Sequence, residues 1–136
     1  MPAPEVTRGR VVLDTNVVVS ALLSPFGPPA RLLAMALAGT LIPCYDGRIL
    51  AEYAEVLARP KFAFDPAVSA AVIDRIQLTG LAVAARPCHI HLPDEDDRPF
   101  LEVAETALAI LVTGNLRHYP GVGRAVGVAE FIDQAG

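Results

Sequence analysis

The sequence is poor in residues that define several classes of protein. Cys44 and Cys88 are its only cysteines, and they lie far apart in a chain of 136 residues. They show no metal-ligand spacing, so we interpret them as reduced core thiols, which are typical of a cytoplasmic protein. The formal net charge is −4, so no overall basic field indicates a nucleic-acid partner. Charge alone therefore decides little about function.

Long apolar runs are also missing. The uncharged stretch over residues 32–45 contains Gly39 and Pro43 and is too short to span a bilayer. The first ten residues, MPAPEVTRGR, lack the apolar core of a signal peptide. We therefore expect no membrane segment.

The composition that remains is that of a folded globular protein. Hydrophobic residues make up 53% of the chain and charged residues 19%. A chain of this length is expected to form one domain, with a core large enough to need no disulfide or structural metal. We predict a flexible N-terminal tail over residues 1–9 and a single domain over residues 10–136.

Short apolar runs alternate with helical patterns along this domain. Five continuous runs predict buried strands, at residues 10–13, 41–45, 81–85, 109–115 and 125–128. Six capped or amphipathic stretches predict helices, at residues 15–23, 30–38, 47–58, 66–80, 100–108 and 129–134. Apolar strands that alternate with helices are typical of a parallel sheet covered on both faces. The predicted fold class is therefore α/β.

Asp14 interrupts the apolar stretch VVLDTNVVVSALL, residues 11–23. An ionised carboxylate is costly to bury unless it is compensated. Asp14 either caps the following helix or ends a buried strand and binds a metal ion. Residues 113–115 end a later strand, and Asp97 begins the helix that leads into it. Ligands of open parallel sheets bind beyond the carboxyl ends of the strands, so these segments are expected to meet in one polar cleft.

Glu52 and Asp97 each have an ordinary structural explanation as well. Glu52 lies off the apolar face of its predicted helix, and local sequence favours a solvated glutamate paired with Arg48 four residues earlier. Asp97 has the alternative role of a helix N-cap that follows the acidic residues 94–96. Asp14 is the acid that such explanations fit least, because it directly follows a buried strand.

Three segments together resemble a PIN-domain protein. They are VVLDTNVVVSALL, DGRILAEYAEVLARPKF, and DEDDRPFLEVAETALAILVTGN with the following RHYP. Their order and spacing are similar to the toxin components of toxin–antitoxin systems that are related to the VapC ribonucleases. The resemblance runs over nearly the whole chain, from Arg10 to the terminal VAEFI.

The resemblance implies an α/β/α sandwich around a central parallel sheet of about five strands. It implies an acidic pocket that binds Mg²⁺ or Mn²⁺ and hydrolyses RNA, and it implies a cognate antitoxin and a homodimer as partners. Asp14, Glu52 and Asp97 match the acids of the family, with Asp96 in place of Asp97 if the register is shifted by one. This match favours a site role for Glu52 over the surface interpretation.

The resemblance also assigns roles within the pocket. Asp14 and Asp97 are the expected principal metal ligands, and Glu52 either completes the shell through water or orients the nucleophilic water. The polar residues expected to support the pocket are Asn16, Thr113 and Asn115. The candidates for binding RNA phosphate at the pocket rim, chosen by sequence position, are Arg48, Arg98 and Arg117.

One departure from the family pattern concerns a fourth acid that many members carry after the same strand. Asn115 and His118 stand there, which leaves a second metal site without its usual carboxylate. The competing interpretation is therefore a catalytically weak PIN-like module that binds RNA or a protein partner. A HAD-type phosphatase is set aside because Asn16 stands where it usually has a second aspartate. A receiver domain is set aside because the only lysine, Lys61, is mid-chain.

Overall fold

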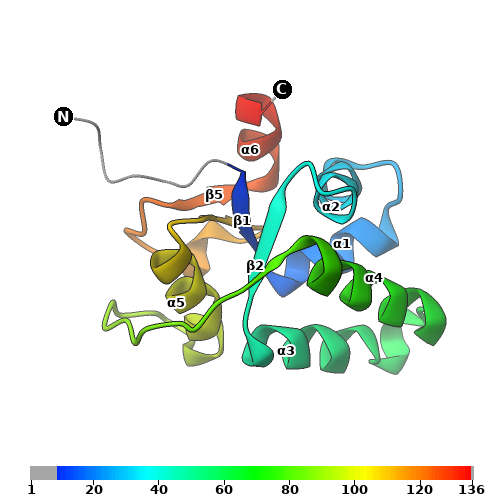
Figure 1. Ribbon diagram of the computed structural model, residues 1–136, viewed down its shortest axis with the longest axis horizontal. Coiled ribbons are helices and arrows are strands. Elements are labelled where there is room, and N and C mark those ends of the chain that lie inside the picture. The colour runs from blue at the N-terminus through cyan, green and yellow to red at the C-terminus, as the bar shows by residue number, and fades with distance from the viewer. Residues whose placement is uncertain (1–8, 136) are drawn as a thin grey trace.

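The computed structural model describes residues 9–135, and Figure 1 shows how their elements are arranged. The strands are β1 (Arg10–Leu13), β2 (Ile42–Tyr45), β3 (Leu81–Ala82), β4 (Ile110–Thr113) and β5 (Ala125–Gly127). The α-helices are α1 (Thr15–Leu23), α2 (Pro28–Leu37), α3 (Gly47–Leu57), α4 (Pro66–Thr79), α5 (Arg98–Ala107) and α6 (Val128–Ala135). Short 3-10 helices are η1 (Pro60–Phe62), η2 (Glu95–Asp97) and η3 (Leu116–His118).

The tail predicted over residues 1–9 lies outside the described residues up to residue 8. Gly9 is described, and its carbonyl oxygen accepts a hydrogen bond from Ile42 N at 2.7 Å. The ladder between the first two strands therefore begins one residue before β1.

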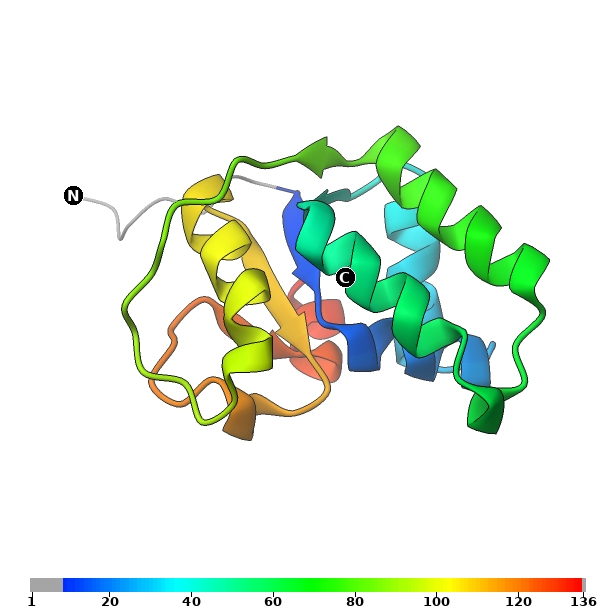
Figure 2. The same ribbon diagram turned by 90° about the horizontal axis from the view of Figure 1, so that it is seen from below.

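The five strands form one parallel sheet in the order β3-β2-β1-β4-β5. Helix α5 contacts β1, β2 and β4 on one face of the sheet, and α6 contacts β4 and β5 on the other face. Figure 2 shows α5 and α3 in front of the sheet and α6 behind it. The predicted α/β/α sandwich with five strands is confirmed. Because the chain places β2 on one side of β1 and β4 on the other, the strand order reverses between β1 and β4.

Helix boundaries follow the capping residues that the sequence indicated. The Asp46 carboxylate accepts a hydrogen bond from Ile49 N at 3.1 Å at the start of α3. The next helix, α4, ends at Gly80, where an added Cβ atom would overlap the carbonyl oxygen of Pro43. Glycine is required there because the end of α4 lies directly against the backbone of β2.

The third strand is shorter than predicted, and the residues after it take another course. β3 covers Leu81–Ala82 instead of 81–85. Val83 N still donates to Tyr45 O at 2.8 Å, but Arg86 N donates to the Thr106 hydroxyl of α5 at 2.9 Å. Residues 83–94 therefore leave the sheet and cross α5 in irregular conformation. We call this segment the 83–94 strap.

The two cysteines are free, but they occupy different environments. Cys44 is buried in β2, as predicted for a core thiol, and burial raises its pKa to about 11. Cys88 is only half-buried because it lies on the 83–94 strap, so its assignment to the core is wrong.

The helices within residues 9–135 are short. No single one is long and apolar enough to cross a bilayer. Only α1 and α2 taken together reach those limits, and they are bent by 108° relative to each other.

Candidate active site

Asp14 is buried at the carboxyl end of β1, beside the end of β4. Its Oδ1 accepts a hydrogen bond from Thr15 N at 2.8 Å. Its Oδ2 accepts from the Thr113 hydroxyl at 2.8 Å and from the Tyr119 hydroxyl at 3.2 Å. A helix cap alone does not explain two hydroxyl donors from outside α1, so the structure holds this carboxylate as part of a polar cluster.

Glu52 lies half-buried on α3 and faces the start of α1. Its carboxylate accepts a hydrogen bond from the hydroxyl of Thr15, the neighbour of Asp14. Arg48, the predicted surface partner, instead pairs with Glu102 of α5 at 2.8 Å. The interpretation of Glu52 as a surface glutamate paired with Arg48 is therefore wrong.

Asp97 is buried where η2 meets α5, whereas its neighbour Asp96 is exposed. This difference favours the register that matches Asp97 to the family acid. Asp97 occupies the N-cap position of α5, but its side chain makes no capping hydrogen bond. His118 Nδ1 lies 3.0 Å from Asp97 Oδ2, yet this buried oxygen accepts no well-aligned hydrogen bond within residues 9–135. Apart from this contact with His118, the oxygen has no partner among the described residues.

We call Asp14, Glu52 and Asp97 the acidic triad. Their carboxyl groups influence one another's pKa values. Burial raises the pKa of Asp14, against the hydrogen bonds from its donors. Burial and the charge of Asp14 raise the pKa of Asp97 to about 6, against the opposing effect of His118. Burial also raises the pKa of Glu52, again with a contribution from Asp14. Ionised carboxylates so close together repel one another unless a cation joins them.

The predicted supporting residues surround the ends of β1 and β4. Asn16 Oδ1 accepts a hydrogen bond from Gly114 N at 2.9 Å, so Asn16 links the two strand ends that Thr113 also links. Asn115 does something else, because its Oδ1 accepts from Arg117 N at 3.2 Å and thereby shapes η3. The Arg117 side chain is exposed.

Two tyrosines at this site were missed by reasoning from the sequence. Tyr119 donates to Asp14, and Tyr53 donates to the carbonyl oxygen of Leu13 at 2.5 Å. Burial, together with the charge of Asp14, raises the pKa of both hydroxyls, which keeps them as donors. The available signals were the RHYP motif and the position of Tyr53 beside Glu52, since a buried tyrosine hydroxyl needs a partner.

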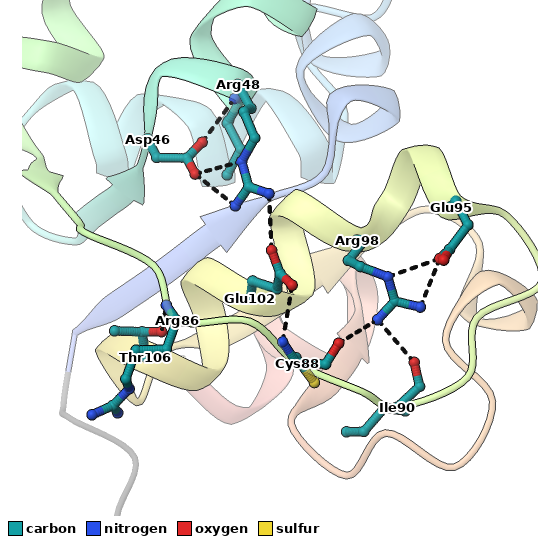
Figure 3. Close-up of polar contacts among 10 residues, drawn as sticks. Asp46, Arg48, Arg86, Cys88, Ile90, Glu95, Arg98, Glu102 and Thr106 are labelled. Carbon is teal, nitrogen blue, oxygen red and sulfur yellow. Dashed lines mark hydrogen bonds and ion pairs between the residues drawn. The ribbon is translucent and has the colours of Figure 1, made fainter.

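Two of the three predicted rim arginines are engaged within the fold (Figure 3). Arg48 pairs with Glu102, and Arg98 donates to the carbonyl oxygen of Cys88 on the 83–94 strap at 2.7 Å. Glu102 in turn accepts a hydrogen bond from Cys88 N at 2.9 Å. These contacts join α3, α5 and the strap, so both guanidinium groups already have partners within the fold, and their binding of RNA phosphate stays a prediction.

The acidic triad offers carboxylate oxygens, the type of ligand that a hard divalent cation takes. Mg²⁺ takes oxygen ligands and keeps several of its waters, and Mn²⁺ accepts similar ligands. Asp97 offers a buried oxygen without a hydrogen bond, in an environment that the other two carboxylates make more negative. Within residues 9–135, no three His, Cys, Asp or Glu side chains are placed so that they could hold a metal ion together.

Comparison with known proteins agrees with this geometry. The model of the PIN domain family matches residues 10–117, from β1 into η3. The chain belongs to the PIN domain family. PIN domains are nucleases in general, so membership gives this chain a nuclease-type function and nucleic acid as its class of substrate.

A relative of this PIN domain is an uncharacterized protein of Methanocaldococcus jannaschii. The two chains are 28% identical over 122 residues, which cover 85% of this chain and 76% of the relative. The similarity therefore extends over most of both proteins, while the family match alone carries the nuclease assignment.

Proposed function

We propose that this PIN domain is a Mg²⁺- or Mn²⁺-dependent endoribonuclease that uses the acidic triad. The observation that supports the proposal is the buried oxygen of Asp97 that accepts no hydrogen bond. Burial raises the pKa of this carboxyl and of the two other acids beside it. Such a group of carboxylates is unfavourable in the fold by itself, and a cation that also binds a phosphate would offset that cost.

Each residue of the acidic triad then has a defined task. Asp14 and Asp97 hold the cation, and the two hydroxyl donors to Asp14 fix the orientation of its carboxylate. Glu52, positioned by Thr15, orients the attacking water and receives its proton. When bound, the cation lowers the pKa of water and stabilises charge on the phosphoryl oxygens. The raised pKa of Glu52 suits a proton acceptor.

The proposal extends to the biological role. The motif segments resemble toxin components related to the VapC ribonucleases, so we place the protein in the cytoplasm as the toxin of a toxin–antitoxin pair. Its partners would then be an antitoxin protein and a second copy of the chain. Co-purification with the product of a neighbouring gene tests this part separately from the chemistry.

Cleavage of RNA with and without Mn²⁺ tests the chemistry, with wild type compared with Asp14→Asn. The amide keeps the shape of Asp14 but removes the ligand charge. Cleavage should fall at least about 100-fold, because a bound metal contributes several kcal/mol to transition-state stabilisation. Circular dichroism should show an unchanged fold. Equal cleavage by both proteins would remove Asp14 from the proposed site.

The competing role is a PIN-like module that binds RNA or a protein partner without cutting. It is favoured by Asn115 and His118 in place of a fourth acid. RNA binding by wild type without any Mn²⁺-dependent cleavage would establish this role instead.

A further inference from the structure

A hollow opens beside the acidic triad at the same edge of the sheet. Its volume is about 630 Å³, and it is lined by residues 113–117, residues 127–130 and Pro29. We call it the β5 groove. Thr113 lines this groove and also donates to Asp14. The groove therefore continues from the triad, past the end of β4, to the end of β5.

The lining of the β5 groove is mostly apolar, with charge at its margin. Leu116 is 47% exposed, and Val128 and Pro29 add further aliphatic surface. A Cβ atom added at Gly127 would meet no atom within 4 Å, so the backbone of β5 borders open space. Arg117 is the basic residue of the lining and Glu130 the acidic one, and both side chains are exposed. Aliphatic surface next to a guanidinium suits a group with a flat apolar part and a phosphate.

A nucleotide has these two parts and the right size. Pockets of roughly 300–1,000 Å³ bind small organic molecules, so the β5 groove has room for at least one nucleotide. In a duplex the bases are stacked and paired, whereas an unpaired strand can turn a base toward a protein surface. An arginine beside the groove matches the next phosphate of the strand.

We propose that the β5 groove binds the nucleotide next to the scissile phosphate of a single-stranded RNA. The base lies against Leu116 and Val128, and the following phosphate lies at Arg117. This inference rests on the proposed nuclease function, because the triad sets the position of the scissile phosphate. It also gives the course of the RNA strand, which runs from the triad toward β5.

Two pairs of matched variants test the groove. Gly127→Leu places a side chain in it, whereas Gly123→Leu adds the same side chain at an exposed glycine outside it, also with open space around its Cβ. Arg117→Glu reverses the charge at the groove, and Arg86→Glu reverses an exposed charge on the 83–94 strap. Fluorescence anisotropy with a labelled single-stranded RNA in EDTA measures binding. Hydrolysis of bis(p-nitrophenyl) phosphate with Mn²⁺ reports on the triad alone.

Both groove variants should weaken RNA binding at least about tenfold, while the two controls stay within about twofold of wild type. Arg117→Glu should also lower the slope of log affinity against log salt by about 1. Gly127→Leu, Gly123→Leu and Arg86→Glu should hydrolyse the small phosphodiester at close to the wild-type rate. If Gly127→Leu fails to fold, Ala129→Leu on the exposed surface of α6 takes its place.

Wild-type affinity for RNA in both groove variants would overturn the inference, and so would equal losses in the controls or equal losses for a duplex of the same sequence. The failure of the nuclease proposal is distinguishable. If wild type hydrolyses neither RNA nor the small phosphodiester, the endoribonuclease is rejected. The anisotropy comparison still decides whether the groove binds RNA.

Discussion

Two groups of buried acids in this PIN domain are compensated in opposite ways. In the acidic triad, burial raises the pKa of every carboxyl, and Asp97 keeps an oxygen without a hydrogen bond. Around Glu102, burial is outweighed by hydrogen bonds from Cys88 N and Arg48, which lower its pKa. The triad lies at the end of the sheet, while the Glu102 group joins α3 to α5 and the 83–94 strap (Figure 3).

The difference distinguishes an acid whose ionised form is favoured by folding from acids whose ionised forms are disfavoured by it. Glu102 has a cation and a backbone N–H as partners, so its ionised form is favoured by folding. The triad has hydroxyl and backbone donors for Asp14 and Glu52, and an imidazole, that of His118, lies beside Asp97 where Glu102 has a guanidinium. Perturbed carboxylates at the switch point of a parallel sheet are typical of functional sites.

Removing one charge from each group is the most direct test of the difference between the acidic triad and the Glu102 group. Glu52→Gln should lower metal-dependent RNA cleavage by at least about 100-fold, because it removes the residue that orients the attacking water. Relief of repulsion within the triad should leave the metal-free protein as stable as wild type or slightly more stable. Cleavage rates and urea denaturation measure the two effects. Full activity with reduced stability would return Glu52 to a purely structural role.

Glu102→Gln should give the opposite result. The amide keeps the acceptor for Cys88 N but loses the charge that pairs with Arg48. The free energy of unfolding should fall by about 2 kcal/mol, in the range of hydrogen bonds to charged groups. Hydrolysis of bis(p-nitrophenyl) phosphate should change far less than in Glu52→Gln. A loss of activity as large as that of Glu52→Gln, at unchanged stability, would place Glu102 in the chemistry.

The fold and the meeting of Asp14 with Thr113 were predictable because local signals and one topological rule determine them, whereas Glu52 was assigned to the site only through the family resemblance. Continuous apolar runs identified all five strand regions, and the rule for strand ends brought Asp14 and Thr113 together. The Glu102 group was not predictable in this way, because Arg48 reaches an acid 54 positions away in the sequence. The local i,i+4 rule selected Glu52 as the partner of Arg48, and tertiary contacts overrode it.

The pH dependence of stability should also differ between the two groups. The pKa of Asp97 is raised to about 6 in the folded protein, against about 3.9 for an unfolded aspartate. The folded state therefore binds this proton more tightly, and the stabilisation present below pH 4 is lost as the pH rises through 6. In metal-free protein the loss should be on the order of 1–2 kcal/mol.

Asp97→Asn should reduce that loss between pH 4 and 6, as measured by urea denaturation in EDTA, and the raised pKa values of Asp14 and Glu52 account for the slope that stays. Glu102 has a lowered pKa, so its contribution runs the other way and is lost as the pH falls through that value. Glu102→Gln is therefore the matched control and should retain the Asp97-dependent slope. An undiminished slope in Asp97→Asn would show that another group titrates there.

The smallest expected effect concerns the residue that faces the triad from η3. His118 Nδ1 lies 3.0 Å from Asp97 Oδ2, where a carboxylate would complete a second metal site. An imidazole nitrogen is a poor ligand for Mg²⁺ and a better one for Mn²⁺. Mn²⁺ should therefore support faster cleavage than Mg²⁺, by about tenfold or about 1.4 kcal/mol of activation free energy.

His118→Asp should narrow this difference, because a hard oxygen ligand replaces the nitrogen and suits Mg²⁺. Calorimetric titration of the RNA-free protein gives an independent check. Wild type should bind at most one Mg²⁺ tightly, since two ions roughly 3.5–4 Å apart require anionic ligands for both. Asn115 supplies none, because it is neutral and its oxygen already accepts from Arg117 N. Two tight Mg²⁺ sites in wild type would show that the fourth carboxylate is dispensable and that His118 does not set the metal preference.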